Sequence, residues 1–381
     1  MSEALAEPKD PGNHIMEYTT YKLSDILKIG NGKDHSSLDD GEYPVLGSGG
    51  VMRYANQYLY DGESVLLPRK GTLNNIQYIK GKFWTVDTCY YTIINQEKVV
   101  PYYLYRMLRY LDLSGLDSGA SIPSMTSKCY YGIKIKLPSI STQRRIASIL
   151  SAYDNLIENN NKRIKILQQM AENLYKEWFV RFRFPGHETT PIENGIPKGW
   201  SINRFDTAAM LINGRAYLMP ELLSEGKYRI VRVGNFSGKD EWFYSDMELE
   251  SDKYCEQGDL LYKWACNFGP EIWNEEKVIY HYHIWKVVPK NNVNKAYLYF
   301  YLKTSTPLWM GGTNGTAMVH ITKESMEKKK MVVPPKSILD QFDNIVGPMI
   351  RNRLSLLKHN ENLIKQRDLL LPRLMSGKLA V

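Results

Sequence analysis

The sequence predicts an α+β protein made of two similar α/β domains and two long helices. Three observations lead to this prediction: an ordered internal repeat, short β-prone runs broken by turn residues in each half, and a heptad-patterned segment after each half. We expect the two helices to pair as an antiparallel coiled coil that separates the domains, with the halves related by a pseudo-two-fold internal repeat.

The repeat covers most of each half in the same order. The matched segments are Asp61–Leu67 with Gln257–Leu261, the strand-like run Trp84–Ile94 with Val278–Val288, Tyr103–Leu108 with Tyr297–Leu302, Gly119–Ile122 with Gly315–Met318, and, more loosely, Asn31-Gly32-Lys33 with Asn213-Gly214-Arg215. Two copies of one module indicate a protein that makes two similar contacts.

Composition shifts divide the chain into six expected parts. They are a flexible N-terminal extension over 1–16, a first domain over 17–138, a spacer helix over 139–184, a Pro/Gly-containing linker over 185–199, a second domain over 200–335, and a second spacer helix with the C-terminal tail over 336–381. Each domain should hold an irregular, largely antiparallel sheet. A shorter helix is expected over Pro101–Tyr110, where Pro begins a run with apolar residues at helical spacing.

The spacer helices carry the heptad pattern. Apolar residues alternate at steps of four and three through Thr142–Trp178, and Ser141 or Thr142 can cap the start. The second helix is expected over Leu339–Leu374. Asn160 and Asn360 each interrupt the pattern near mid-helix, and the alternatives of a buried pair that fixes register and of exposed side chains remain open.

Composition limits the function classes. Hydrophobic residues make up 43% of the 381 residues, yet no apolar run reaches the ~18 residues of a membrane span. The four cysteines, Cys89, Cys129, Cys255 and Cys266, form no CxxC pair, which argues against a zinc site and suits a reducing cytoplasm. The formal net charge of +8 favours an anionic partner, nucleic acid above all.

Catalytic motifs are missing from the sequence. The Gly-rich stretches complete no dinucleotide or phosphate-loop fingerprint, and there is no GxSxG elbow or HExxH pair. His281 and His283 alternate along the strand-like run and so should share one face. A metal pair is possible there, but a polar strand face is favoured, since the expected counterparts are Asp87 and Cys89.

Two loops in each half suit nucleic acid: the first is Pro68–Asn75 with its counterpart Lys263–Gly269, and the second is Gly119–Thr126 with its counterpart Gly315–Thr322. Arg and Lys bind guanine edges or phosphates, Asn binds adenine, and small hydroxyl residues let backbone amides approach phosphate. The alternatives are a solvated loop for the first and packing for the second. With further isolated cations, the candidate DNA-binding residues are Lys33, Arg53, Arg69, Lys70, Thr72, Asn74, Asn75, Ser121, Ser124, Arg215, Arg232, Lys263, Asn267, Thr316 and His320.

The chain resembles the DNA-specificity subunit of a type I restriction-modification enzyme from Tyr21 to Leu379. The segments that carry the resemblance are Gly62–Gly71, Gly119–Ser124, Leu137–Ile146, Val333-Pro334-Pro335 with Gln341, and Leu371–Leu379. The second half departs from the first at Lys263-Trp264, where the first has Pro68-Arg69, so the basic contact does not transfer residue by residue.

The resemblance implies two target-recognition domains, each reading one half of a bipartite site in double-stranded DNA. The helices would set the spacing and dock two methyltransferase subunits, and motor/nuclease subunits would join for cleavage. It further implies no catalysis and no cofactor on this chain, with S-adenosylmethionine, ATP and Mg on the partner subunits, and a cytoplasmic location without membrane contact. The alternatives are a stand-alone duplicated-domain nuclease and a DNA-binding repressor or architectural protein.

Overall fold

The computed structural model describes residues 17–70, 73–111, 124–238, 241–310, 321–379 and 381. The expected extension over 1–16 lies outside them. The chain forms two compact units: unit 1 contains Met1–Glu158 and Asn362–Val381, and unit 2 contains Asn159–Glu361. Unit 1 is therefore built from two separate stretches of chain.

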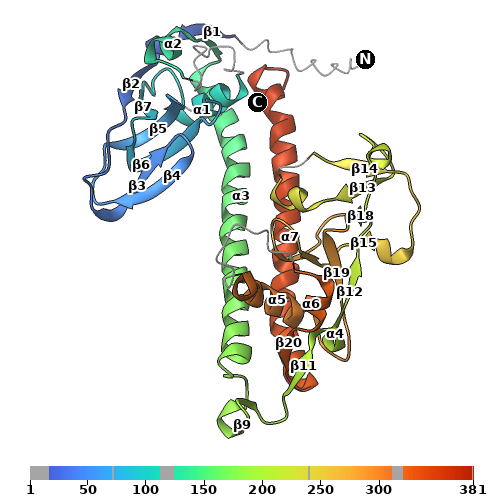
Figure 1. The fold of residues 1–381 in the computed structure, drawn as a ribbon. Helices are drawn as coiled ribbons and strands as arrows, with labels where there is room; N and C mark the ends of the chain where they lie inside the picture. The colour runs from blue at the N-terminus through green and yellow to red at the C-terminus, as the bar shows by residue number, and fades with distance from the viewer. Residues whose placement is uncertain (1–16, 71–72, 112–123, 239–240, 311–320, 380) are drawn as a thin grey trace, which may run out of the picture. The chain divides into compact units, whose positions relative to one another are not determined.

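Unit 1 holds a six-stranded sheet in the order β2-β7-β5-β6-β3-β4, in which only β3 and β6 pair in parallel (Figure 1). Its elements are β1 (Thr19–Lys22), β2 (Leu27–Asn31), β3 (Asp40–Gly47), β4 (Gly50–Ala55), β5 (Tyr60–Pro68), β6 (Gln77–Thr85), β7 (Cys89–Ile94), α1 (Pro101–Tyr110), α2 (Ser127–Gly132) and β8 (Lys134–Leu137), which pairs with β1. The helix over Pro101–Tyr110 is confirmed, with Pro at its first position.

Unit 2 repeats these strand pairings in two four-stranded sheets, β12-β19-β16-β17 and β14-β13-β18-β15. Its elements are β9 (Ile192–Glu193), β10 (Ile196–Pro197), β11 (Ser201–Arg204), α4 (Phe205–Ala208), β12 (Ala209–Asn213), β13 (Tyr228–Val231), β14 (Phe243–Ser245), β15 (Tyr254–Cys255), β16 (Leu260–Lys263), β17 (Gly269–Ile272), β18 (Val278–Tyr280), β19 (Ile284–Pro289), α5 (Lys295–Met310), α6 (Lys323–Glu327) and β20 (Lys330–Val333), which pairs with β11.

The long strands of unit 1 are interrupted in unit 2. β15 and β16 together take the place of β5, and β17 and β18 take the place of β6, since β13 pairs in parallel with β18 as β3 does with β6. The first interruption is a turn in which the Asp259 carboxylate accepts the Glu256 amide at 2.9 Å and Gly258 has φ of +90°. A left-handed residue of this kind favours glycine and ends a strand.

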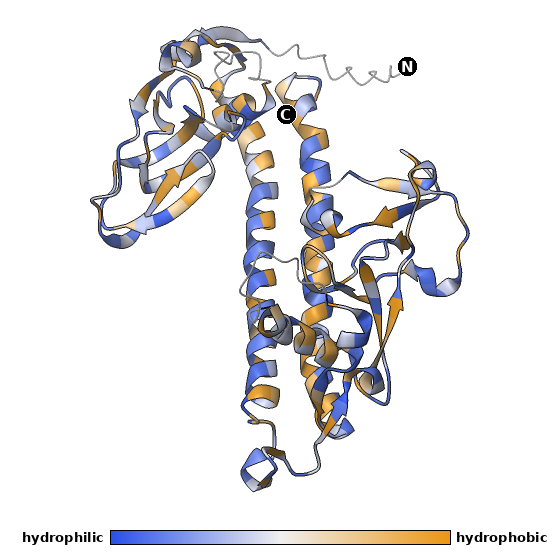
Figure 2. Ribbon diagram, in the orientation of Figure 1, coloured by the Kyte–Doolittle hydropathy of each residue, from blue (hydrophilic) through white to orange (hydrophobic). Residues whose placement is uncertain are grey.

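Two long helices contribute to both units: α3 (Ile140–Tyr175), followed by a π-helical turn over Lys176–Val180, and α7 (Lys336–Met375). Figure 2 shows apolar residues recurring between polar ones along both helices. α3 begins earlier than expected, because Ser139, rather than Ser141 or Thr142, is the capping residue and its hydroxyl accepts the Thr142 amide at 3.3 Å.

The helices contact each other within each unit. In unit 2 the Asn160 amide donates to the Asn360 oxygen at 2.9 Å, and both residues are buried, 5% and 6% exposed, which answers the question the sequence left open. In the π-helical turn that continues α3, Trp178 packs on Phe342 of α7, so the contacts run in opposite directions along the two helices. In unit 1 Arg367 of α7 pairs with Asp154 of α3 at 2.8 Å.

Candidate nucleic-acid interface

One glycine in each unit lies in close contact with the backbone of a turn that joins two strands, β6 to β7 in unit 1 and β18 to β19 in unit 2. A Cβ added to Gly32 would lie 1.9 Å from the carbonyl oxygen of Val86, and one added to Gly214 would lie 2.3 Å from that of Tyr280. Real Cβ atoms do not come so close, so only glycine allows this approach of two backbones. The looser Asn-Gly-Lys and Asn-Gly-Arg match in the sequence therefore marks a structural equivalence.

The backbone around the two turns, here called the turn frame, is hydrogen-bonded in the same way in both units. The four matched pairs are Lys33 N to Thr85 O (2.8 Å) with Arg215 N to Tyr280 O (3.0 Å), Val86 N to Leu46 O (3.0 Å) with His281 N to Val231 O (2.9 Å), Cys89 N to Val86 O (3.0 Å) with Ile284 N to His281 O (3.0 Å), and Arg69 N to Thr88 O (2.8 Å) with Trp264 N to His283 O (3.2 Å). The same scaffold thus presents different side chains in each unit.

The turn frame corrects two sequence-based expectations. Each strand-like run, Trp84–Ile94 and Val278–Val288, is two strands joined by a tight turn, because residues 86–88 and 281–283 leave the sheet. His281 and His283 therefore lie in a turn rather than along a strand. Their counterparts, set by the matched bonds, are Val86 and Thr88 rather than Asp87 and Cys89.

Each turn lines a hollow. Hollow 1, about 460 Å³, is bounded by the turn of unit 1 and the tip of the β3–β4 hairpin. Its lining residues are Asp34, His35, Gly47–Met52, Val86, Asp87 and Thr88. Hollow 2, about 580 Å³, is bounded by the turn of unit 2 and the segment after β13. Its lining residues are Arg232, Val233, Gly234, Ser237, Cys266, Asn267, His281 and His283. In each hollow, the residues opposite the turn come directly after an equivalent strand in the sequence, β3 in unit 1 and β13 in unit 2.

The two hollows differ in charge. Among the described lining residues, hollow 1 has two carboxylates and no Lys or Arg, whereas hollow 2 has one Arg and no carboxylate. The hydroxyl and amide of Ser36 donate to Asp34 and lower the pKa of that carboxyl. Burial, with smaller effects of His283 and Arg232, lowers the pKa of His281 to about 4, so this imidazole is neutral at pH 7.

The first candidate loop of unit 1 divides into exposed and engaged residues. Arg69, Lys70 and Asn74 are exposed, and the Arg69 guanidinium lies 5.9 Å from the Tyr90 ring centre. The Asn75 amide instead donates to the Ser48 carbonyl at 2.5 Å, which ties this loop to the β3–β4 tip. Ser124 forms a β-bridge with Lys70 beside that loop.

The counterpart loop of unit 2 has one exposed candidate. Asn267 is exposed and lines hollow 2. Lys263 is buried, with its side chain 5% exposed, and its ammonium pairs with Glu271 at 3.1 Å. A lysine at the end of a strand looks accessible in sequence, but this one lies over the Phe236 ring inside the unit.

The isolated cations also differ in their surroundings. Lys33 is exposed next to the unit 1 turn. Arg53 bonds the Leu38 carbonyl and Asp40, both at 2.9 Å. Arg215 makes a bidentate pair with Glu221 at 2.9 and 2.6 Å. Arg232 donates to the Glu241 carbonyl at 3.2 Å and lies over the Phe243 ring. The remaining candidates, Thr72, Ser121, Thr316 and His320, lie outside the described residues.

Sequence reasoning missed Asp34 and the turn residues Asp87, Thr88 and Tyr282 as candidates. The sequence did contain a signal for the turns. The matched tripeptides Asn31-Gly32-Lys33 and Asn213-Gly214-Arg215 each precede a strand-like run, Trp84–Ile94 or Val278–Val288, whose apolar pattern continues across the turn. Aligning the copies one residue differently would have placed Asp87 opposite Tyr282. Both are the exposed tips of their turns.

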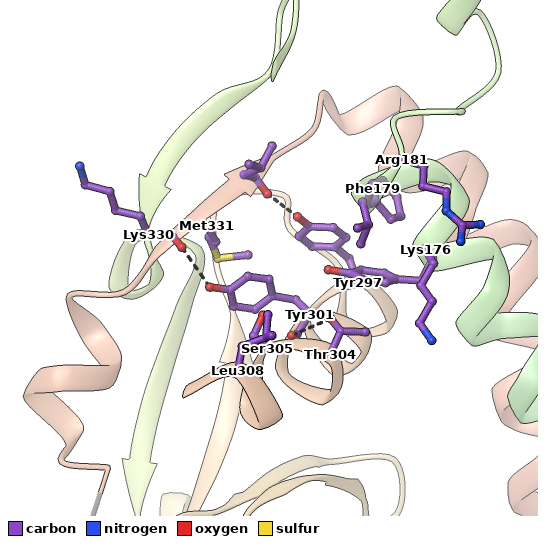
Figure 3. A pocket seen from close by; sticks show the side chains of 13 residues that line it. Lys176, Phe179, Arg181, Tyr297, Tyr301, Thr304, Ser305, Leu308, Lys330 and Met331 are labelled. Atoms are coloured by element: carbon purple, nitrogen blue, oxygen red, sulfur yellow. Dashed lines mark hydrogen bonds between the residues drawn. The ribbon is translucent and has the colours of Figure 1, made fainter. Parts of the chain in front are cut away.

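Another hollow in unit 2, about 490 Å³, lies between the end of α3, α5 and β20 (Figure 3). It has an aromatic floor, and the Tyr301 hydroxyl donates to the Lys330 carbonyl at 3.1 Å. Across the described ranges, no group of three or more His, Cys, Asp or Glu side chains is placed to hold a metal ion. No described helix is long and apolar enough to cross a membrane.

Comparison with known proteins identifies the family. The family model described as "Type I restriction modification DNA specificity domain" matches residues 16–169 and 197–359. The type I restriction enzyme MjaIX specificity subunit of Methanocaldococcus jannaschii is 23% identical, and the match covers 98% of this chain and 96% of that protein. A putative type I restriction enzyme specificity subunit of Haemophilus influenzae, S.HindORF215P, is 22% identical, with 91% and 89% covered.

A solved structure shares the fold. The crystal structure of a type I restriction-modification system S subunit from M. genitalium superposes with a TM-score of 0.70 at 14% identity, covering 97% of this chain and 99% of that one. The family domain matches twice, once in each half of the chain. The chain belongs to the type I restriction-modification DNA specificity family.

Proposed function

We propose that this chain is the DNA-recognition subunit of a type I restriction-modification complex and that each unit reads one half of a bipartite target. The observation that carries the proposal is the doubled turn frame: one backbone scaffold, present once in each unit, carries different side chains. Two readers with one docking geometry and different base contacts would recognise two different half-sites.

Base or phosphate contacts are proposed for the exposed candidates, which are Lys33 beside the unit 1 turn, Arg69, Lys70 and Asn74 in the first loop of unit 1, and Asn267 in its counterpart. Arg53, Arg215 and Lys263 are engaged with carboxylates of their own units. Their proposed role is to hold the loops, since a paired cation contributes less to a phosphate contact.

The helices supply the second part of the proposal. We expect α3 and α7 to form an antiparallel coiled-coil spacer that docks two methyltransferase subunits and sets the gap between half-sites. Each unit offers exposed apolar side chains on its helical stretches: Leu156, Ile364 and Leu369 in unit 1, and Ile166, Met170 and Ile345 in unit 2. S-adenosylmethionine, ATP and Mg would belong to the methyltransferase and motor/nuclease partners.

The decisive experiment measures methylation of a random-site duplex library by the full chain with and without a methyltransferase partner. The expected result is a bipartite methylated site with the partner, and neither methylation nor Mg-dependent cutting by the chain alone. Turnover by the chain alone, lost on mutating its own residues, would instead support the duplicated-domain nuclease. Binding without any bipartite preference would support an architectural DNA binder.

Docking can be tested with a matched pair of variants. Leu369→Asp places a charge on an exposed apolar side chain of α7 and should weaken methyltransferase capture by roughly tenfold or more, since a desolvated charge is costly. The control, Gln366→Asp, adds the same charge at an exposed polar position three residues away. Equal capture by both variants would exclude this stretch of α7 from the docking surface.

Spacing can be tested by lengthening both helices. Seven residues inserted after Asn159, with seven after Asn360, add ~10 Å of helix while keeping the heptad phase. The expected result is a gap longer by about three base pairs, at ~3.4 Å each, with unchanged half-sites. The change can be smaller because DNA bends. Active variants with an unchanged gap would refute the spacer role.

A further inference from the structure

We propose that hollows 1 and 2 are the base-reading sites and that they read opposite hydrogen-bonding edges in the major groove. Hollow 1 would accept a hydrogen bond from an exocyclic amino group, cytosine N4 or adenine N6. Hollow 2 would donate to the acceptor edge of guanine, N7 and O6. This inference rests on the proposed function and adds to it which residues choose the bases.

The first support is that the hollows combine a fixed backbone with variable side chains. The four matched hydrogen bonds and the close contacts of Gly32 and Gly214 hold both turns in one geometry. At the exposed tip, unit 1 has Asp87 where unit 2 has Tyr282. Base reading needs side chains held to within a fraction of an ångström, and a turn locked at its backbone provides that support.

Hollow 1 has the chemistry of an acceptor. Asp34 and Asp87 are carboxylates, and an ionised carboxylate accepts at two oxygens but donates nothing. The bonds from Ser36 occupy part of the Asp34 acceptor capacity, whereas Asp87 is the exposed tip. Asp and Glu accept from the amino group of cytosine in the major groove. Two carboxylates would repel a phosphate, so backbone binding does not explain this hollow.

Hollow 2 has the chemistry of a donor. The Arg232 guanidinium has five N–H donors, of which one Nη2 hydrogen bonds the Glu241 carbonyl at 3.2 Å, and the exposed Asn267 carries an amide NH₂. His281 is neutral at pH 7 and keeps one ring N–H. Arg paired with guanine N7 and O6 is the commonest specific contact in the major groove. The acceptor hollow and the donor hollow therefore suit different bases on the same scaffold.

The exposed cations flank the hollows rather than line them. Lys33 follows Gly32 at the edge of the unit 1 turn, and Arg69 donates its backbone amide to Thr88 of that turn. Neither side chain lines hollow 1. Cations beside a base-reading turn can hold the phosphates while the turn enters the groove.

The test uses the full chain assembled with its methyltransferase partner and a randomised duplex library. Asp87→Asn replaces an acceptor oxygen by a donor and should lower preference at one base pair of one half-site by roughly tenfold. Asp87→Ala, which adds no donor, should relax the same position without favouring a new base. Arg232→Gln should reduce selection for guanine in the other half-site only. The control Asp61→Asn makes the same charge change at an exposed site on β5 and should leave both half-sites unchanged.

The outcomes separate this inference from the proposed function. If the unmodified complex selects a bipartite site and the Asp87 and Arg232 variants bind it more weakly with unaltered base preferences, the base-reading role of the hollows is wrong while the proposed function stands. If both half-sites change in one variant, the assignment of one hollow to each half-site is wrong. If the unmodified complex selects no bipartite site, the proposed function itself fails.

Discussion

In unit 1 the short helix α1 contacts a long helix through charged side chains, whereas in unit 2 the short helix α5 contacts a long helix through aromatic rings. Arg106 of α1 is 4% exposed, donates to Asp154 of α3 and bonds the Tyr102 hydroxyl at 3.0 Å. The repeat places Phe300 of α5 at the position of Arg106 and α7 at the position of α3, and the Phe300 ring lies edge-on to Phe342 of α7 with the ring centres 6.3 Å apart. The same fold tolerates either chemistry at this junction, but the charged version depends on every partner being present.

The largest expected effect comes from breaking the charged junction. Asp154→Ala leaves Arg106 buried without its carboxylate, so the free energy of unfolding should fall by about 3–5 kcal/mol. Arg106→Phe combined with Asp154→Leu imitates the apolar junction of unit 2 and should recover part of that loss, because Arg367 still lacks Asp154. Urea unfolding measures both. A double variant as unstable as the single one would show that the two junctions are not interchangeable.

The second effect tests the turn frame that both units share. Gly32→Ala forces a Cβ against the Val86 carbonyl and should cost about 1–3 kcal/mol through overpacking. Gly214→Ala should behave in the same way in unit 2. Gly49→Ala is the control, because a Cβ there meets nothing within 4 Å. Thermal melting curves of the three variants measure this loss of stability. A Gly32 variant as stable as the Gly49 variant would disprove the close contact between Gly32 and Val86.

A smaller effect concerns the buried Asn160–Asn360 pair in the helix contacts of unit 2. Asn160→Ala leaves the Asn360 oxygen without the bond from Asn160, at a cost of about 1–2 kcal/mol. Replacing both residues by Leu should restore or raise stability while weakening the preference for one register. Thermal unfolding gives the stability, and cross-linking between α3 and α7 gives the register. Unchanged stability in the single variant would mean that the buried pair contributes nothing.

The smallest effect separates His281 from its counterpart Val86. The pKa of His281 in the folded chain is about 4, below the ordinary 6.5. As pH falls from 6.5 to 4, the unfolded chain takes up a proton that the folded chain does not, so stability falls in this window. His281→Val should remove that part of the pH dependence. Because the imidazole is partly exposed, the difference between pH 7 and 4.5 should be small. Identical pH profiles would contradict it.

The sequence predicted the elements whose signals are local or periodic. Pro at position 101 and the helical spacing after it located α1, and the heptads located α3 and α7 to within a few residues. It did not predict the turns at 86–88 and 281–283, because Val86 is apolar and buried, so the β pattern continues across the bend. The end of the strand becomes apparent from long-range backbone contacts, such as that of Val86 with Gly32, which exist only in the folded chain.

The candidate site was predictable in part for the same reason. Exposed loop cations such as Arg69 and Lys70 follow from a turn after a strand. The burial of Lys263 does not, because it depends on Glu271 and Phe236, which neighbour it only after folding. The sequence comparison aligned the two copies in the correct order, but its alignment was shifted by one residue at the turns. Hydrogen bonds, rather than residue identity, set that alignment.

The composition of unit 1 from two separate stretches has a consequence for the order of synthesis. Leu374 and Met375 belong to the same buried cluster as Leu104 and Ile146, yet the ribosome makes them after all of unit 2. Unit 2 is one continuous stretch of chain, so its core can form while unit 1 still lacks the C-terminal part of α7. We therefore expect that, in a chain truncated after residue 361 and released from the ribosome, unit 2 resists protease while unit 1 does not. Equal resistance of both units would show that unit 1 closes without the part of α7 that follows residue 361. The C-terminal part of α7 therefore completes the core of unit 1 only after unit 2 has been synthesised.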